Sequence, residues 1–562
     1  MKGGRDNFLA DRRELTNLAA LQPGPNRNIP RLDLARYFFA NGFAAEALGV
    51  LRVMVQDDAT LENTAALRAL RGAAQAMMYH YRDAVEDLSH PSLTGNDEAE
   101  FWRAAAEAAL GNPEAQAQTL KDKSSVIKDY SHPLKMRLAV IGATSAIAAG
   151  DDLTAQNFLD LIDLPENGPN DRAAIGYYTG KLNELIGAFD AAVSNWEEVE
   201  KSSSRYYRAL AGMDKIELQL KLKNITPAEA AAAMEKLRFA WRGGLYEFTL
   251  LRRLGELYMA VGNYGEGLRT FKQLATAFQA YPEAKAITQL MRDAFERLYL
   301  QGAAETLPPV TAIALYNEFK ELTPTGEKGD EMIRKLADRV ASVDLLSDAA
   351  TLLDQQVKYR AVGEDKAKIG ARLALVHLLN RRPAETLDAL KLSDVKTTSP
   401  ELALQRRHLQ ARALADLGKS AEAIDLLKDD ASRDGRLLMT EIQWKNKNWP
   451  EAAITLENMV TKPERGGVLK PEDQKLVLDR TIALALAQDT RGLAKVRRDF
   501  LPFIKDSADY AEMFNLLTVP NEMGMIDYTK LGDKIKLAEG FQAFMTIYRE
   551  KLRSGELSAA IK

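Results

Sequence analysis

Residues suited to acid–base, metal or nucleophilic chemistry are few and scattered in this sequence of 562 residues. Cysteine is absent, which excludes disulfides, thiol nucleophiles and cysteine-ligated metal sites. No two histidines lie four residues apart, so the spacing of a helical zinc site does not occur. The histidines are His80, His90, His132, His377 and His408. We therefore expect no catalytic residue, no cofactor and no metal site.

Two glycine-containing motifs resemble nucleotide-binding loops only in part. Gly418-Lys419-Ser420 resembles the end of a phosphate loop, but the residue five positions before Gly418 is Ala413 instead of glycine. Gly265 and Gly267 begin no dinucleotide fingerprint, because no predicted strand precedes them and the third glycine is missing. We interpret Gly418 as a turn between two helices.

The charge balance argues against a general nucleic-acid binder. Lysine plus arginine number 75 and aspartate plus glutamate 79, which leaves a net charge of −4 where a basic excess would be expected. Two short basic clusters, 406–408 and 495–498, are interpreted as solvated helix faces, although an acidic peptide partner could use them. Hydrophobic residues make up 46% and charged residues 27%, as in globular proteins. We expect other proteins as partners, and no nucleic acid.

No segment predicts insertion into a membrane. The longest apolar run, 138–149, is too short for a spanning helix, and the opening residues contain no apolar signal core. The sequence as written predicts a cytoplasmic protein. Because Met1-Lys2-Gly3-Gly4 leads directly into helical sequence, a fragment of a periplasmic protein that lacks an upstream export signal stays open. A membrane-associated complex is compatible with either compartment.

A helical phrase recurs along the chain. Each copy has a helical run, then Gly or Asn, then an Ala-rich second run. The small residue that opens the second run recurs about every 37 residues, a period typical of helix-pair repeats. It falls near Ala47, Ala84, Ala115, Ala155, Ala192, Ala230, Gly267, Ala349, Thr386, Ala423, Ala452 and Ala494. A single pair cannot bury its apolar stripe alone, so the pairs must stack.

Each residue type in the phrase has a physical role. Glycine after the first helix accepts the left-handed conformation that ends it, as at Gly42 and Gly262. Small residues allow two helices to approach closely. Large residues such as Trp196 and Phe271 are expected to fill the space between neighbouring pairs.

The best-preserved phrase resembles the tetratricopeptide repeat family. It comprises Leu254, Gly255, Tyr258, Gly262, Tyr264, Gly267 and Phe271, with Gly267 in place of the usual alanine. Partial matches are Ala35, Phe38, Gly42, Ala47 and Leu51; Ala411, Leu414, Gly418, Ala423 and Leu427; and Trp449, Ala452 and Leu456. The other units are degenerate, so related helix-pair families with a looser consensus stay open. The resemblance implies an all-α fold, an α-solenoid with a right-handed superhelix of about 12–15 helix pairs.

Irregular segments suggest domain boundaries. Pro308-Pro309 and Thr323-Pro324-Thr325-Gly326 interrupt the repeats, with a short helix expected over 310–322 between them. We expect a solenoid over 1–300, a joint over 301–330 and a second solenoid over 331–528. A capping helix is expected over 529–562, whose apolar face could instead dock on a partner. That face comprises Leu537, Phe541, Phe544, Met545, Tyr548 and Leu552.

The family resemblance also implies a groove that holds a peptide or a partner's helix. Its first helices would line the groove with three sets of residues: Leu32, Arg36 and Phe39; Thr249, Arg252, Glu256 and Met259; and Gln405, His408 and Arg412. These positions contain no lysine-and-asparagine clamp for a carboxy-terminal peptide. Charge reversal at Arg252 and Arg412 is therefore expected to weaken partner binding.

Two classes of function follow from this architecture. The preferred one is a non-catalytic scaffold, expected in a bacterial complex, that binds peptides or helices of other proteins and helps to assemble the complex. The alternative is an all-helical α/α-toroid enzyme acting on carbohydrate. Such sites need dense inward-facing aromatic, histidine and carboxylate side chains, whereas five histidines and five tryptophans are spread over the whole chain.

Overall fold

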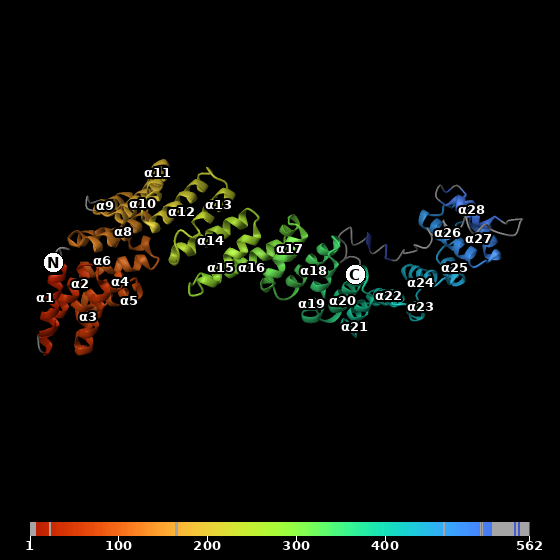
Figure 1. Cartoon of the computed structure of the whole chain (residues 1–562), viewed down its shortest axis with the longest axis horizontal. Coiled ribbons are helices and arrows are strands. Elements are labelled where there is room, and N and C mark those ends of the chain that lie inside the picture. The colour runs from red at the N-terminus through yellow and green to blue at the C-terminus, as the bar shows by residue number, and fades with distance from the viewer. Residues whose placement is uncertain are drawn as a thin grey trace. The chain divides into compact units, whose positions relative to one another are not determined.

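The computed structural model describes residues 7–21, 24–162, 167–396, 398–464, 467–505, 507, 510–519, 545–546, 549–550 and 561. Every regular element among these residues is helical. The chain divides into two compact units, Met1–Ile287 and Thr288–Lys562. Figure 1 colours the helices of the first unit from red to green and those of the second from green to blue.

In the first unit, one leading helix is followed by seven helix pairs. The leading helix is α1 (Phe8–Leu21). The pairs are α2 (Asn28–Ala40) with α3 (Ala44–Asp57), α4 (Ala65–Met77) with α5 (Tyr81–Leu88), α6 (Asp97–Ala109) with α7 (Pro113–Asp122), α8 (His132–Ala148) with α9 (Asp152–Asp160), α10 (Pro169–Leu185) with α11 (Phe189–Glu200), α12 (Arg205–Lys221) with α13 (Pro227–Leu237), and α14 (Gly244–Ala260) with α15 (Tyr264–Ala277). Short 3-10 turns are η2 (Gly24–Arg27), η3 (Ala59–Asn63), η4 (Pro91–Leu93) and η5 (Ser124–Asp129).

The second unit contains six further pairs and one closing helix among its described residues. The pairs are α16 (Ala284–Leu300, which begins just before the division) with α17 (Pro309–Glu318), α18 (Glu327–Ser342) with α19 (Leu346–Tyr359), α20 (Gly363–Leu379) with α21 (Pro383–Leu392), α22 (Pro400–Asp416) with α23 (Ser420–Leu427), α24 (Arg433–Lys445) with α25 (Trp449–Glu457), and α26 (Pro471–Leu486) with α27 (Thr490–Ile504). The closing helix is α28 (Ala511–Thr518). The described part of the chain thus holds thirteen pairs, within the predicted range.

Left-handed residues end the first helix of the pairs, as predicted. Gly42, Gly262 and Gly418 have φ of 84°, 77° and 81°. In other pairs a residue with a side chain takes this conformation, including Tyr79 at 66° and Lys447 at 59°. A side chain there costs about 1–2 kcal/mol relative to glycine. Such turns cannot be recognised from glycine alone.

Within several pairs, a large side chain of the second helix lies on a glycine of the first. A Cβ on Gly255 would lie 2.4 Å from the Phe271 ring, and a Cβ on Gly180 would lie 2.4 Å from the Trp196 indole. Phe158 covers Gly142 in the same way. In each case the two residues are sixteen positions apart. Trp196 and Phe271 therefore pack inside their own pair, whereas we expected them to fill the space between pairs.

Successive pairs stack in single file. The first helices contact one another in the order α2, α4, α6, α8, α10, α12, and again in the order α20, α22, α24. A continuous apolar core runs from α2 to α10, and a separate one joins α24 to α28. The predicted fold class, an all-α solenoid of helix–turn–helix pairs, is confirmed. The handedness of the superhelix stays a prediction.

The division between the units falls before the predicted joint. Residues 301–330 lie inside the second unit and contain α17 between η6 (Ala303–Thr306) and η7 (Lys320–Leu322). The expected short helix is present, and Tyr316 on α17 packs against Phe295 and Tyr299 of α16 at ring-centroid distances of 6.0 and 5.8 Å. These aromatic contacts tie α17 to α16 as an ordinary pair. Bending at 301–330 stays a prediction.

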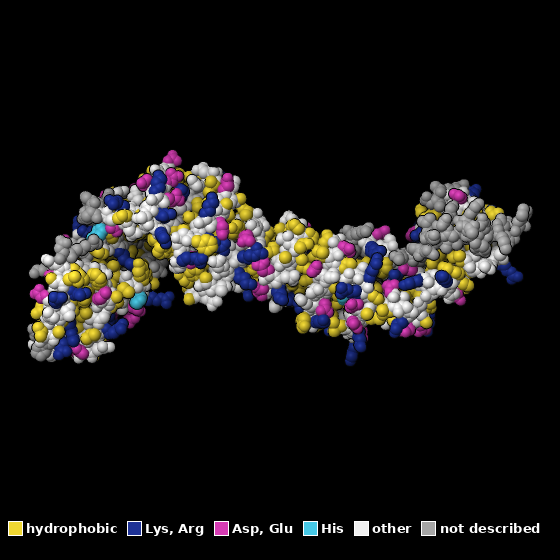
Figure 2. Space-filling view, in the orientation of Figure 1, with side chains coloured by type: hydrophobic (Ala, Val, Ile, Leu, Met, Phe, Trp, Pro, Cys, Tyr) yellow, Lys and Arg dark blue, Asp and Glu magenta, His cyan; other side chains and the backbone are white. Residues whose placement is uncertain are grey.

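The predicted cap over 529–562 lies mostly outside the described residues. Of its expected apolar face only Met545 is described, and its side chain is buried. A search of the described helices finds none with the length and apolar character needed to cross a bilayer. Figure 2 shows acidic and basic side chains intermixed on the face in view, as the balanced composition predicts.

Candidate binding groove

A groove of about 620 Å³ lies on the first-helix side of the first unit. Residues of α2, α4, α6 and α8 line it, together with the end of η5. Its floor is an alanine stripe on α4 that includes Ala66, Ala69 and Ala73. Positions three and four apart share one face of a helix, so these alanines form one continuous strip. Alanine is the strongest helix former, so these residues stabilise α4. Alanine also has the smallest side chain with a Cβ, so the floor of the groove lies close to the backbone of α4.

Aromatic side chains form one wall of the groove. Phe39 and Trp102 lie 5.6 Å apart between ring centroids, and Trp102 lies 6.1 Å from Tyr130. The Trp102 indole Nε1–H donates a hydrogen bond of 2.9 Å to the Tyr130 hydroxyl, which in turn donates to Glu98. Burial, together with the adjacent Glu98 carboxylate, raises the pKa of Tyr130. The wall is therefore uncharged and held in one orientation.

Two polar side chains that line the groove, Asn96 and Ser131, are already engaged within the chain. The Asn96 side chain accepts a hydrogen bond of 3.0 Å from the Ala99 amide and caps α6. The Ser131 hydroxyl donates to the Ala40 carbonyl. The groove offers both apolar and polar surface, and the exposed charged residues Arg36, Glu98 and Asp129 are part of its lining.

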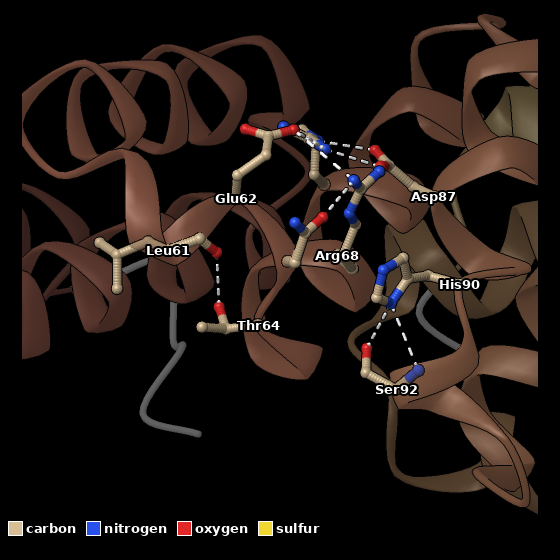
Figure 3. A network of polar contacts seen from close by, with 9 residues as sticks. Leu61, Glu62, Thr64, Arg68, Asp87, His90 and Ser92 are labelled. Carbon is tan, nitrogen blue, oxygen red and sulfur yellow. Dashed lines mark hydrogen bonds and ion pairs between the residues drawn. The ribbon is translucent and has the colours of Figure 1, made fainter.

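An ion network on the other side of α4 holds this helix against its neighbours. Asp87 of α5, whose side chain is only 4% exposed, accepts hydrogen bonds of 2.5 Å from Arg68 and 2.7 Å from Arg71. Arg71 also contacts Glu62 at 2.8 Å, and this hydrogen bond lowers the pKa of Glu62. Figure 3 shows Glu62, Arg68 and Asp87 pointing toward one another. The two arginines lie at least about 100° around the helix from Ala69, so the network leaves the groove open.

The structure places the first predicted set of groove residues together. Arg36 and Phe39 both line the groove, Arg36 exposed at its rim and Phe39 buried in its wall. Leu32 is half-buried and packs against the core instead. Binding of a partner by these residues stays a prediction.

The second predicted set does not line this groove. Arg252 and Glu256 form an ion pair of 3.1 Å, and Thr249 is exposed beside them. Met259 lies over α15, where a Cβ on Gly267 would come within 2.7 Å of its Cε atom. Met259 therefore belongs to packing inside its pair.

The third predicted set is largely used by the chain itself. His408 is buried, with 4% of its side chain exposed, and its Nε2 contacts the Asp430 carboxylate. Arg412 contacts Glu441 and Asp416, the latter at 3.0 Å. Gln405 is half-buried. The expectation that His408 faces a partner is wrong, because its side chain is buried against Asp430. The helix period predicts the face on which a residue lies, but it does not predict how closely a neighbouring helix covers that face.

Sequence reasoning missed the floor and most of the wall of the groove. The alanines of α4 resemble the alanines of every second helix, so the sequence pattern does not single them out. A stripe of alanines three and four apart on a first helix is the signal that could have identified the floor. Among the residues that the structure describes, no group of three His, Asp or Glu side chains is placed to hold a metal ion.

Comparisons with known proteins add little to this description. No protein-family model matches the chain, and no curated protein matches it. A solved structure of Naa15/Naa10 bound to HypK-THB is similar at 12% identity and a TM-score of 0.21, with 99% of this chain and 78% of that chain covered. The APC/C hetero-tetramer Cut9-Hcn1 is similar at 12% identity and a TM-score of 0.29, with 88% of this chain and 93% of that chain covered. At these scores the likenesses carry no functional inference, and the fold class rests on the helices themselves.

Proposed function

We propose that the chain is a non-catalytic interaction scaffold that helps to assemble a multiprotein complex. In this proposal its first unit holds an amphipathic helix of a partner protein in the groove between α2, α4, α6 and α8. The supporting observation is the groove of about 620 Å³ whose lining includes the α4 alanines and the Phe39–Trp102 wall. Burying apolar area there contributes about 25 cal/mol per Å².

A helix suits this groove better than an extended peptide. An extended peptide needs partners for its own N–H and C=O groups, but Asn96 and Ser131 are already hydrogen-bonded within the chain. A helix satisfies its backbone internally and presents apolar residues at three- and four-residue spacing. The low alanine floor also allows the helix to lie close to α4. The groove chemistry therefore favours a helical occupant.

The proposal can be tested with a displayed library of helix-forming peptides. Peptides would be selected on the full chain and counter-selected on Ala69→Trp, which fills the floor of the groove. We expect the remaining peptides to show apolar residues at three- and four-residue spacing and to gain helicity on binding, measured by circular dichroism. Ala69→Trp is expected to weaken their binding at least tenfold, about 1.4 kcal/mol.

A matched control is Ala115→Trp, at an exposed position on the second helix α7. This variant adds the same side chain away from the groove and should bind the selected peptides like the unmodified chain. The proposal is contradicted if counter-selection leaves no peptide, if the retained peptides bind in extended form, or if both tryptophan variants bind equally well.

A further inference from the structure

A second surface of the first unit lies at the start of α12, whose first residues are Arg205-Tyr206-Tyr207-Arg208. Arg205, Tyr206 and Arg208 are all exposed. The first turn of α12 contains no acidic residue. Cations at a helix N-terminus are unfavourable by about 0.3–1 kcal/mol each, so this arrangement does not serve the stability of the helix.

Exposed aromatic side chains adjoin these arginines. Trp241, which follows α13, contacts Tyr206 with ring centroids 5.2 Å apart. Trp241 remains 39% exposed and Phe239 remains 67% exposed. Phe239, Leu237, Arg205 and Arg208 line a hollow of about 550 Å³. We call Arg205, Tyr206, Arg208, Phe239 and Trp241 the aromatic–arginine patch.

Carboxylates near the aromatic–arginine patch are paired elsewhere. Glu200 contacts Lys215, and Glu247 contacts Arg242 at 3.4 Å. No ion pair or hydrogen bond of the Arg205 or Arg208 side chains is found among the described residues. Two guanidinium groups therefore stand uncompensated beside exposed aromatic surface. Tryptophan, tyrosine and arginine are the residues most enriched where partners bind proteins tightly.

The basic cluster at 406–408 differs in this respect. Arg406 donates hydrogen bonds to the carbonyl oxygens of Ala367 and Leu390 at 2.8 and 2.6 Å, and His408 is buried. Those side chains are committed to the fold. The sequence predicts a solvated helix face for that cluster, with an acidic peptide partner as the alternative, and only Arg407 of the three residues is exposed.

We infer that the aromatic–arginine patch binds an acidic peptide segment of a partner protein. Carboxylates of the segment pair with Arg205 and Arg208, since guanidinium groups bind carboxylates through two parallel hydrogen bonds. An apolar or aromatic side chain of the same segment packs between Phe239 and Trp241. The patch shares no residue with the groove, so this inference does not depend on the proposed helix binding.

The test uses a displayed library of random peptides selected on the full chain. Counter-selection on the double variant Arg205→Glu/Arg208→Glu retains the peptides that need the patch. We expect these peptides to be enriched in Asp and Glu around one apolar residue. Their binding, measured by fluorescence anisotropy, should weaken at least tenfold in the double variant and at least threefold when the salt concentration rises from 50 to 500 mM.

Two variants control for fold and net charge. Lys419→Glu/Lys428→Glu changes the charge by the same amount at exposed positions of the second unit and should leave binding unchanged. Trp241→Ala keeps both arginines and should weaken binding at least tenfold. The inference is overturned if counter-selection retains no peptide, if the retained peptides lack acidic residues, or if a single-stranded oligonucleotide binds the patch more tightly than they do.

Discussion

The α4/α5 pair of the first unit and the α22–α24 region of the second carry similar ion networks on different sides of their first helices. In the first, Asp87 draws Arg68 and Arg71 to the side of α4 that faces α5. In the second, Arg412 of α22 reaches Glu441 of α24, the next first helix along the stack. The first network therefore lies on the side of α4 away from the groove. The second joins α22 and α24, whose equivalents in the first unit line the groove.

The position of each ion network affects how much of the first-helix side stays open. Where the charges are held on the side of α4 that faces α5, Ala66 and Ala69 keep part of their surface open to the groove. Where Arg412 and Glu441 link first helices, with 14% and 7% of their side chains exposed, the same side is occupied by the chain itself. The two regions share one architecture, and the placement of a few charges decides how much of the first-helix side stays open in each.

The largest expected effect is at Asp87. Asp87→Ala leaves Arg68 and Arg71 without their shared carboxylate in a buried setting, which should lower the free energy of unfolding by about 3–5 kcal/mol. Urea unfolding followed by circular dichroism measures this loss. Asp83→Ala, at an exposed position of the same helix, should not change stability measurably. Equal effects of the two changes would show that the network does not hold α4 in place.

The second-largest loss of stability is expected when the Arg412–Glu441 ion pair is broken. Burial lowers the pKa of Arg412, but Glu441 and Asp416 outweigh burial and raise it. Glu441→Ala should therefore cost about 2–4 kcal/mol, and a double-mutant cycle with Arg412→Ala should give a coupling of about 1–3 kcal/mol. The exposed pair Lys428–Asp425 should show no measurable coupling. A coupling near zero would contradict the view that this link closes the first-helix side.

The Arg412–Glu441 ion pair changes the expectation for charge reversal at Arg412. Charge reversal at Arg412 would place a new carboxylate beside those of Glu441 and Asp416, so loss of partner binding in that variant would report damage to the fold. Arg252, with 49% of its side chain exposed and an ion pair to Glu256 at 3.1 Å, stays a fair test of binding. In the repeat, Arg252 corresponds to His408 and Arg412 to Glu256, so the two arginines occupy different positions.

Local signals explain why the helix pairs were predictable and the binding surfaces were not. Gly42, Gly262 and Gly418 mark turns because the repeat sets where the first helix of each pair ends, and a residue in the left-handed conformation is needed after that end. The alanine floor, the Arg412–Glu441 link and the aromatic–arginine patch each depend on side chains from different repeats. Tyr206 meets Trp241 across 35 positions of sequence, a contact that no single repeat encodes.

A buried carboxylate without an arginine offers a third case. Asp479 on α26 is 9% exposed, and its Oδ2 has no hydrogen-bond partner among the described residues. Burial raises its pKa from 3.8 to about 7. Because the folded pKa is the higher one, Asp479 favours folding below pH 3.8 and this contribution is lost as the pH rises toward 7.

Asp479→Asn removes that pH dependence. At pH 8 the variant should be more stable than the unmodified chain by on the order of 1–3 kcal/mol, and at pH 4 the two should unfold alike. Thermal unfolding at both pH values measures the difference. Asp434→Asn, at an exposed position, should show no such pH-dependent gain. A gain of equal size at both pH values would mean that the pKa of Asp479 is the same in the folded and the unfolded chain.

The smallest expected effects are at the turns of the two compared regions. Tyr79 and Lys447 both adopt the left-handed conformation, with φ of 66° and 59°. Lys447→Gly relieves this strain at an exposed side chain and should stabilise the chain by up to about 1 kcal/mol. Tyr79 differs because the Arg137 guanidinium lies 3.8 Å from its ring centroid.

Tyr79→Gly relieves the same strain but loses that cation–π contact, which contributes about 0.5–1 kcal/mol at exposed sites. The two terms nearly cancel, so we expect no net change in the thermal unfolding midpoint of this variant, against a rise for Lys447→Gly. An equal rise in both would show that the Arg137 contact adds nothing. A fall for Tyr79→Gly would show that it outweighs the strain, and that the turn of α4 and α5 uses tyrosine to hold α8 against the groove-forming repeats.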